Sequence, residues 1–179
     1  MKSVKKIQLG SIVICALYAS TAFSANNSVV NFSATISSAT CDVNTNISGN
    51  NIDLGSWVIA SFKANSTSNF LEVAESAKDF VVQLSNCSNA TNPYENSSIK
   101  LTGASAWRSN NKFFSNSTIN ETGVIIRNND NIIGNDGTVK IEEDGTAAFT
   151  ATLASTFAQN TSISKGRISV PVTFSYITN

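Results

Sequence analysis

The sequence predicts an all-β fold, an antiparallel β-sandwich, from three observations. No stretch keeps a 3.6-residue apolar period for three turns, which an amphipathic helix would require. Short runs of alternating apolar and polar residues recur instead, at intervals of roughly ten residues. Asn, Gly and Asp residues stand between these runs, where the chain is expected to turn.

The first half of the chain contributes three such runs. Residues 30–36 alternate strictly, with Val, Phe, Ala and Ile on one face and Asn, Ser and Thr on the other. Residues 80–84 form a half-buried run just before Cys87, and residues 99–101 alternate around a lysine. Because successive side chains of a strand point to opposite faces, each run predicts a strand with one buried face.

The second half continues the pattern. Residues 124–126 form a short buried run. Residues 135–137, Asn-Asp-Gly, are a hairpin-turn signal and lead into the alternating residues 139–141. A second turn, Asp-Gly at 144–145, precedes a strand over residues 147–153.

A last strand is predicted over residues 168–176, whose apolar side chains all share one parity. Pro171 lies inside this run and cannot donate a ladder hydrogen bond. The strand is therefore expected to lie at the edge of a sheet, or to bulge at the proline.

Composition narrows the range of functions. The chain has 179 residues, 12 Lys and Arg against 12 Asp and Glu, and no His. The absence of His excludes a Ser-His-Asp triad and a His-ligated zinc site. The balanced charge argues against a nucleic-acid partner, which would require a basic face. We therefore expect neither an enzyme nor a cofactor.

The first 24 residues read as a secretory signal peptide. A short cationic start is followed by an apolar run over residues 7–19 and by small residues at 22 and 24. The run is too short for a membrane span. Export leaves residues 25–179 with two cysteines, Cys41 and Cys87. An even cysteine count in an oxidising compartment predicts a disulfide, worth about 4 kcal/mol for a loop of roughly 46 residues; the alternative is two free thiols.

The alternating segment up to residue 36 precedes the first cysteine and opens the exported chain. Terminal segments usually fray unless something holds them. Two interpretations remain open on the residues alone. The segment could be the first strand of its own sandwich, or an arm that joins the sheet of another molecule.

Several motifs occur in a fixed order along the exported chain. They are residues 30–36 followed by Cys41-Asp42-Val43, Asp53-Leu54-Gly55, residues 80–87 ending in Cys87, Gly123-Val124-Ile125-Ile126, residues 149–153, and residues 172–176. In order and spacing they resemble the chaperone–usher pilins, the type 1 and P fimbrial subunits. Two departures stand out: Ala34 occupies a position where the family usually has Gly, and three residues follow Tyr176, which the family places next to last.

The resemblance implies an incomplete immunoglobulin-like β-sandwich of six strands, whose seventh strand another protein donates in trans. It divides the chain into a signal peptide (1–24), an N-terminal donor-strand extension (25–36) and a pilin domain (37–179). The donor-strand face comprises Ser28, Val30, Phe32, Ala34 and Ile36. The C-terminal strand faces the groove and the chaperone through Val170, Val172, Phe174 and Tyr176.

The function implied by the resemblance is that of a structural pilin subunit supporting cell adhesion. Its partners are a periplasmic pilus chaperone, an outer-membrane usher and neighbouring pilin subunits, and a host glycan only indirectly. The chain is expected to pass through the periplasm to a fimbrium on the cell surface. The alternative is a small single-domain adhesin that binds host glycan directly, for example by stacking Trp57 or Trp107 on a sugar.

Two other motifs carry less weight. Residues 162–165 match S-x-x-K, a nucleophile motif, but no S-D-N or K-T-G accompanies them, so a polar turn is the better interpretation. Residues 129–143 fail as a calcium loop in either register, because an isoleucine falls at a ligand position. A hairpin turn is predicted there instead.

Overall fold

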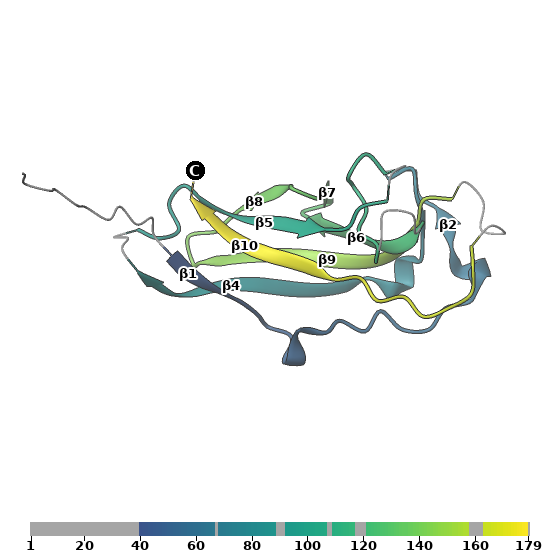
Figure 1. Cartoon of the computed structure of the whole chain (residues 1–179), viewed down its shortest axis with the longest axis horizontal. Helices are drawn as coiled ribbons and strands as arrows, with labels where there is room; N and C mark the ends of the chain where they lie inside the picture. Colours follow the sequence, from purple (N-terminus) through teal and green to yellow (C-terminus); the bar gives the residue numbers. More distant parts are fainter. Residues whose placement is uncertain are drawn as a thin grey trace, which may run out of the picture. The chain divides into compact units, whose positions relative to one another are not determined.

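A computed structural model of the chain describes residues 40–66, 68–88, 92–106, 109–116, 121–157 and 163–178. Among these residues the regular structure consists of β-strands and three short 3-10 turns (Figure 1). The strands are β1 (Thr40–Thr45), β2 (Lys63–Ala64), β3 (Leu71–Glu72), β4 (Lys78–Ser88), β5 (Ser97–Gly103), β6 (Thr122–Asn128), β7 (Asn131–Ile133), β8 (Thr138–Lys140), β9 (Thr146–Ser155) and β10 (Val172–Thr178). The 3-10 turns are η1 (Ser48–Asn50), η2 (Ile59–Ser61) and η3 (Ala74–Ser76).

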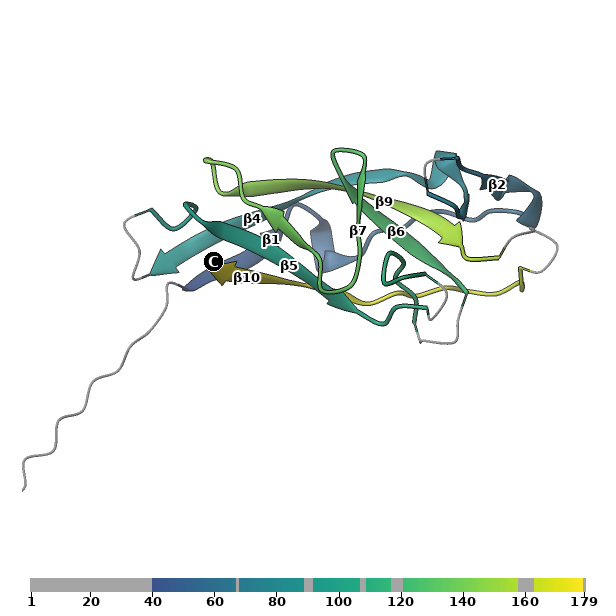
Figure 2. The ribbon, with the colours of Figure 1, turned by 90° about the horizontal axis from the view of Figure 1, so that it is seen from above.

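The strands form two antiparallel sheets packed face to face (Figures 1 and 2). In the larger sheet, β9 lies at the centre. It pairs with β4 and β3 on one side and with β6 on the other, β1 lies beyond β4, and β7 lies beyond β6. The smaller sheet has the order β10-β5-β8. The prediction of an all-β sandwich is therefore confirmed.

Alternating side chains build the core between the sheets. Val82 and Leu84 of β4 are almost fully buried, whereas Gln83 between them is exposed. Phe80 of β4 and Ile99 and Leu101 of β5 are buried in the same core. The larger sheet adds Phe149 from β9, whose ring stacks on Phe80 at 5.5 Å between centroids. The apolar residues therefore face inward, as the period-2 pattern predicts.

A second apolar cluster covers part of the outer face of the larger sheet. Phe113 and Phe70 pack there against Ile125 of β6 and Ala154 of β9, and Phe113 is 0% exposed. The neighbouring Phe114 belongs to the main core and pairs with Val124. Consecutive phenylalanines thus serve two layers because successive side chains point to opposite faces.

The turns confirm one expectation and correct another. A hairpin does fall within residues 129–143: β6 and β7 are joined by Asn129 and Asp130, which both have positive φ, 48° and 67°. The hairpin predicted at residues 135–137 is wrong, because this turn connects β7 in one sheet to β8 in the other. Turn residues indicate that the backbone bends, but they do not determine whether the two strands that the turn connects pair with each other.

The last strand is also shorter at its start than predicted. It begins at Val172, directly after Pro171, and residues 168–171 lie outside the ladder. Proline lacks the N–H that a ladder needs, so pairing starts only beyond it. The expectation that this strand lies at an edge is confirmed, since β10 pairs with β5 alone.

Candidate functional site

The sandwich is open along one side, where the two sheets end. β1 is the last strand of the larger sheet there, and β10 is the last strand of the smaller sheet. The two strands contact each other, and Figures 1 and 2 show them running side by side. Among the described residues no ladder joins them. Each strand therefore presents one edge of backbone N–H and C=O groups without a strand partner.

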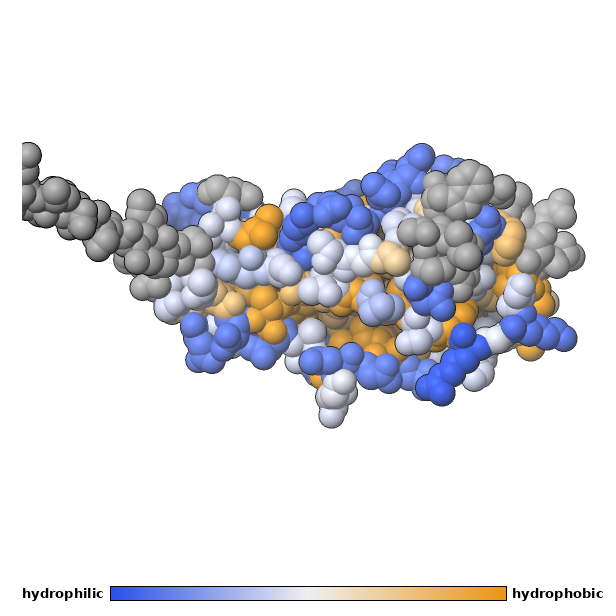
Figure 3. Space-filling model, viewed as in Figure 1, coloured by the Kyte–Doolittle hydropathy of each residue, from blue (hydrophilic) through white to orange (hydrophobic). Residues whose placement is uncertain are grey.

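Apolar side chains line both rims of this open side, which we call the groove. They are only partly buried, although they pack against the core. Figure 3 shows an apolar stripe along this side of the molecule, between β10 and the segment that follows β1, interrupted in places by polar residues. The first rim contributes Val43, Ile47, Ile52, Leu54 and Ile59, and the second contributes Ile168, Val170, Val172, Phe174 and Tyr176.

Strict alternation produces the second rim. Ile168, Val170 and Val172 are half-buried, whereas Ser169, Pro171 and Thr173 between them are exposed. Phe174 extends the stripe into the core, because its ring meets those of Phe80 and Phe149 edge-on at 5.7 and 5.4 Å. The groove is therefore continuous with the hydrophobic core and is not an isolated surface patch.

The Asp-Leu-Gly motif shapes the first rim. The Asp53 carboxylate accepts a hydrogen bond from the backbone N–H of Gly55 at 2.9 Å, which closes a tight turn. Gly55 has φ of 87°, a conformation that favours glycine. The turn leaves Leu54 packed against the core and Asp53 exposed. The Asp-Leu-Gly sequence therefore forms a turn that places Leu54 at the groove, although no strand ladder supports this segment.

A disulfide fixes the β1 edge. Cys41 and Cys87 are bonded, with Cα atoms 4.1 Å apart, which confirms the predicted pair. The bond ties β1 to β4 where their register is interrupted, between Thr40 and Asp42. A covalent link thus replaces ladder hydrogen bonds at the irregular end of this edge strand.

A small polar cluster fixes the end of β10. The Tyr176 hydroxyl donates to the Pro93 carbonyl oxygen at 3.2 Å and lies 3.1 Å from the Ser97 hydroxyl. Ser97 also donates to Pro93 at 2.6 Å. Because Tyr176 pairs with Ile99 in the ladder, these bonds hold β10 in register with β5.

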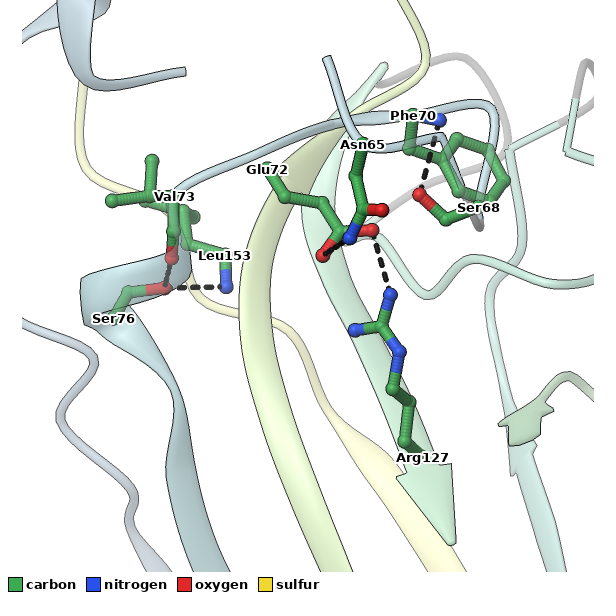
Figure 4. A network of polar contacts seen from close by, with 8 residues as sticks. All are labelled: Asn65, Ser68, Phe70, Glu72, Val73, Ser76, Arg127 and Leu153. Atoms are coloured by element: carbon green, nitrogen blue, oxygen red, sulfur yellow. Dashed lines mark hydrogen bonds and ion pairs between the residues drawn. The ribbon is translucent and has the colours of Figure 1, made fainter. Parts of the chain in front are cut away.

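Among the described residues, a largely buried ion pair lies away from the groove (Figure 4). Arg127 of β6 donates to Glu72 of β3 at 2.7 Å, and Asn65 donates to the other carboxylate oxygen at 3.0 Å. Burial alone would raise the pKa of the Glu72 carboxyl, but hydrogen bonds from Arg127, Ser68 and Asn65 hold that pKa below its usual value. The pair joins strands that flank β9 on opposite sides, and sequence reasoning did not identify it.

The structure places only some of the predicted residues. Val170, Val172, Phe174 and Tyr176 come together along the second rim. The predicted donor-strand residues Ser28, Val30, Phe32, Ala34 and Ile36 lie outside the described residues, as do Trp107 and Ser162. Trp57 is 37% exposed, and its indole N–H donates to the Leu54 carbonyl oxygen at 2.6 Å.

The described residues contain no group of three His, Cys, Asp or Glu side chains placed to hold a metal ion. In the same part of the chain, no helix has the length and apolar character needed to cross a bilayer. The groove has apolar walls and backbone edges, which suit binding of an extended peptide.

Two solved structures are similar to this chain. The P pilus rod subunit PapA matches with a TM-score of 0.59 and 14% identity, over 84% of this chain and 99% of that one. A chain from a chaperone–usher pilus matches with a TM-score of 0.48 and 15% identity, over 87% and 97% of the two chains. No curated protein sequence matches. The first likeness supports an incomplete immunoglobulin-like sandwich fold.

The sequence itself gives the family. The family model described as "Fimbrial protein" matches residues 30–175, which includes every strand described above apart from the last residues of β10. Proteins of this kind are structural and not enzymatic. The chain belongs to the fimbrial protein family.

Proposed function

We propose that the groove accepts an extended strand from another polypeptide, and that the chain is a structural pilin subunit of a surface fimbria built by the chaperone–usher pathway. The observation that carries this proposal is a long strand edge lying beside a half-buried apolar stripe. An added strand would bond to the backbone of β10 and cover the stripe with alternate side chains.

The proposed occupant in the fibre is the arm, residues 25–36, of a second copy. Its apolar face would bring Val30, Phe32 and Ile36 into the groove, each worth roughly 1.5–3 kcal/mol as an upper estimate. Ladder hydrogen bonds would add about 0.5–1.5 kcal/mol apiece. Such a contact is strong without any covalent chemistry.

Before assembly, the same groove would be filled by a strand from a periplasmic chaperone. Exchange of that strand for the arm of the next subunit would take place at an outer-membrane usher, after removal of residues 1–24. Residues 37–179 would then form the pilin domain. The finished fimbria would support cell adhesion through its surface position.

Antiparallel pairing sets the direction of the arm. An antiparallel ladder is slightly more stable per residue than a parallel one. We therefore place the beginning of the arm near Tyr176 and its end near Val170, at the start of β10. The next copy then lies beyond that end of the groove, so the subunits follow one another head to tail.

Paired variants of neighbouring residues test the groove. Val170→Trp should fill it, because this side chain is half-buried on the rim, whereas Ser169→Trp places the same bulk on the exposed side. A subunit carrying Val170→Trp should no longer accept an arm but should still donate its own. Deletion of residues 25–36 should have the converse effect.

The assay is the formation of fibres, and of one-to-one pairs when the two defective subunits are mixed, measured by native electrophoresis. We expect pairs but no fibres from the mixture, and normal fibres from Ser169→Trp. Fibre formation by the deletion variant alone would overturn the proposal, as would equal effects of the two tryptophans.

A further inference from the structure

The two ends of the groove differ in charge. At the end where the chain enters β1 and β10 finishes, the loop before β5 and the turn before β9 carry exposed carboxylates, which we call the acidic end. It comprises Glu95, Glu142, Glu143 and Asp144, with Lys140 as an exposed cation beside them. One contact shows that these segments meet: the backbone N–H of Ile141 donates to the Ser97 carbonyl oxygen.

The acidic end is hollow. An open pocket of about 770 Å³ lies there, lined by the loop before β5 and by the residues that follow β8. The Tyr94 ring packs against Gly145, where an added Cβ would come within 2.7 Å of the ring. Two hydrogen bonds from Thr146, from its hydroxyl at 2.6 Å and its backbone N–H at 3.0 Å, lower the pKa of Asp144. Glu95, Glu142 and Glu143 line the pocket together with Lys140, so acidic side chains outnumber basic ones on its rim.

The other end carries an exposed basic loop, residues 164–167. Ile163 before it is buried beside Phe62 and Leu71, and Ile168 after it is half-buried in the same cluster. Anchored on both sides, the loop presents Lys165 and Arg167 to solvent.

Neighbouring charges leave this end positive. Lys63 of β2 adds an exposed cation there, and Glu75 of η3 one exposed anion. A Cβ added at Gly166, between Lys165 and Arg167, would meet no atom within 4 Å. The loop therefore projects from the surface with room around it for a partner.

The proposed direction of the arm brings unlike ends together. An arm that runs antiparallel to β10 leaves the groove beside the basic loop, and the acidic end of the donor copy begins at its Thr40. Residues 37–39 between arm and domain span at most about 10–14 Å. A parallel arm would instead bring two acidic ends face to face, which like charges oppose.

We propose that the basic loop of one copy docks into the acidic pocket of the next, an interaction that rests on the proposed head-to-tail assembly. The partner is a second copy of this chain. The contact fixes the rotation of one subunit against the next and speeds their approach. Exposed ion pairs are individually weak and screened by salt, so the groove provides most of the affinity and the charges set the orientation.

Charge reversal tests this contact in the one-to-one pair. The acceptor lacks residues 25–36 and carries Lys165→Glu and Arg167→Glu; the donor carries Val170→Trp together with Glu142→Lys and Glu143→Lys. Reversal on either partner alone should slow pairing about tenfold at low salt and by less at 500 mM NaCl. Reversal on both should restore the rate to within about twofold. Lys78→Glu, an exposed change on β4, is the matched control.

A free peptide of residues 25–36 separates the possible failures. It should bind the reversed acceptor as tightly as the unreversed one, which also shows that the variant is folded. If pairing is normal but single reversals have no effect, or double reversal fails to restore the rate, the end-to-end contact is wrong. If neither the peptide nor the donor binds the unreversed acceptor, the proposed function fails instead.

Discussion

Replacing Arg127 by Met should be among the most destabilising single changes outside the core. The side chains of Arg127 and Glu72 are only 14% and 6% exposed. Removing the guanidinium leaves a buried carboxylate without its cation, which costs about 3–5 kcal/mol. With a urea slope of about 2 kcal/mol per M, the unfolding midpoint should fall by roughly 1.5–2.5 M. Equilibrium urea unfolding, followed by tryptophan fluorescence at one protein concentration, measures it.

The matched control is the exposed pair of Lys100 and Asp136. Its atoms are equally close, at 2.7 Å, but its side chains are 36% and 60% exposed. Asp136→Asn should therefore cost less than about 1 kcal/mol. The double variant Glu72→Met with Arg127→Met should recover much of the loss, because it buries no unpaired charge.

The pH dependence gives this prediction a second readout. Because the pKa of Glu72 is lower in the folded chain than its usual 4.5, its stabilising contribution is complete above that pH and is lost as the pH falls through the folded value. Without Arg127, less opposes the effect of burial, which raises the pKa of the Glu72 carboxyl. Glu72 then takes up a proton more readily, so the loss of stability caused by Arg127→Met should shrink as the pH falls from 7 toward 4.5. A loss no larger than that of Asp136→Asn, or one independent of pH, would refute the reasoning.

Other changes test the packing of β6, the disulfide and the anchor of β10. Gly123→Ala should cost about 1–3 kcal/mol in thermal unfolding, because a Cβ there would overlap the Phe114 carbonyl oxygen; an unchanged midpoint would contradict this close packing. Replacing both Cys41 and Cys87 by Ser should cost about 4 kcal/mol through the 46-residue loop, and thiol labelling of the native protein should find no free thiol. Tyr176→Phe should cost about 0.5–1.5 kcal/mol and speed hydrogen exchange in β10; unchanged exchange there would exclude the proposed anchor.

The strands could be predicted because alternation reports burial directly. Phe80, Val82 and Leu84 are buried, as the run over residues 80–84 requires. The unbroken apolar run at residues 124–126 likewise matches a strand covered on both faces. What covers the outer face could not be predicted, since nothing local marks Phe113 as the partner of Ile125.

Long-range polar pairing was equally invisible in the sequence. Glu72 and Arg127 are 55 residues apart and meet only because β3 and β6 lie on opposite sides of β9. The second rim of the groove was easier to predict from the sequence, because most of its residues belong to one run of strict alternation. The first rim was harder, since Ile47, Ile52 and Leu54 belong to a segment with little regular structure.

The lengths of the edge strands explain why an added strand would bind at the groove and not at another edge. The edge strands β2, β7 and β8 have two, three and three residues, whereas β10 has seven. Ordering each residue of an incoming strand costs about 1–2 kcal/mol, and each ladder bond returns about 0.5–1.5 kcal/mol. Hydrogen bonds alone therefore do not compensate for the ordering cost at any edge. Only beside β10 does the incoming strand also cover a half-buried apolar stripe, so burial there decides the site, and short edges elsewhere protect the subunit from wrong pairing.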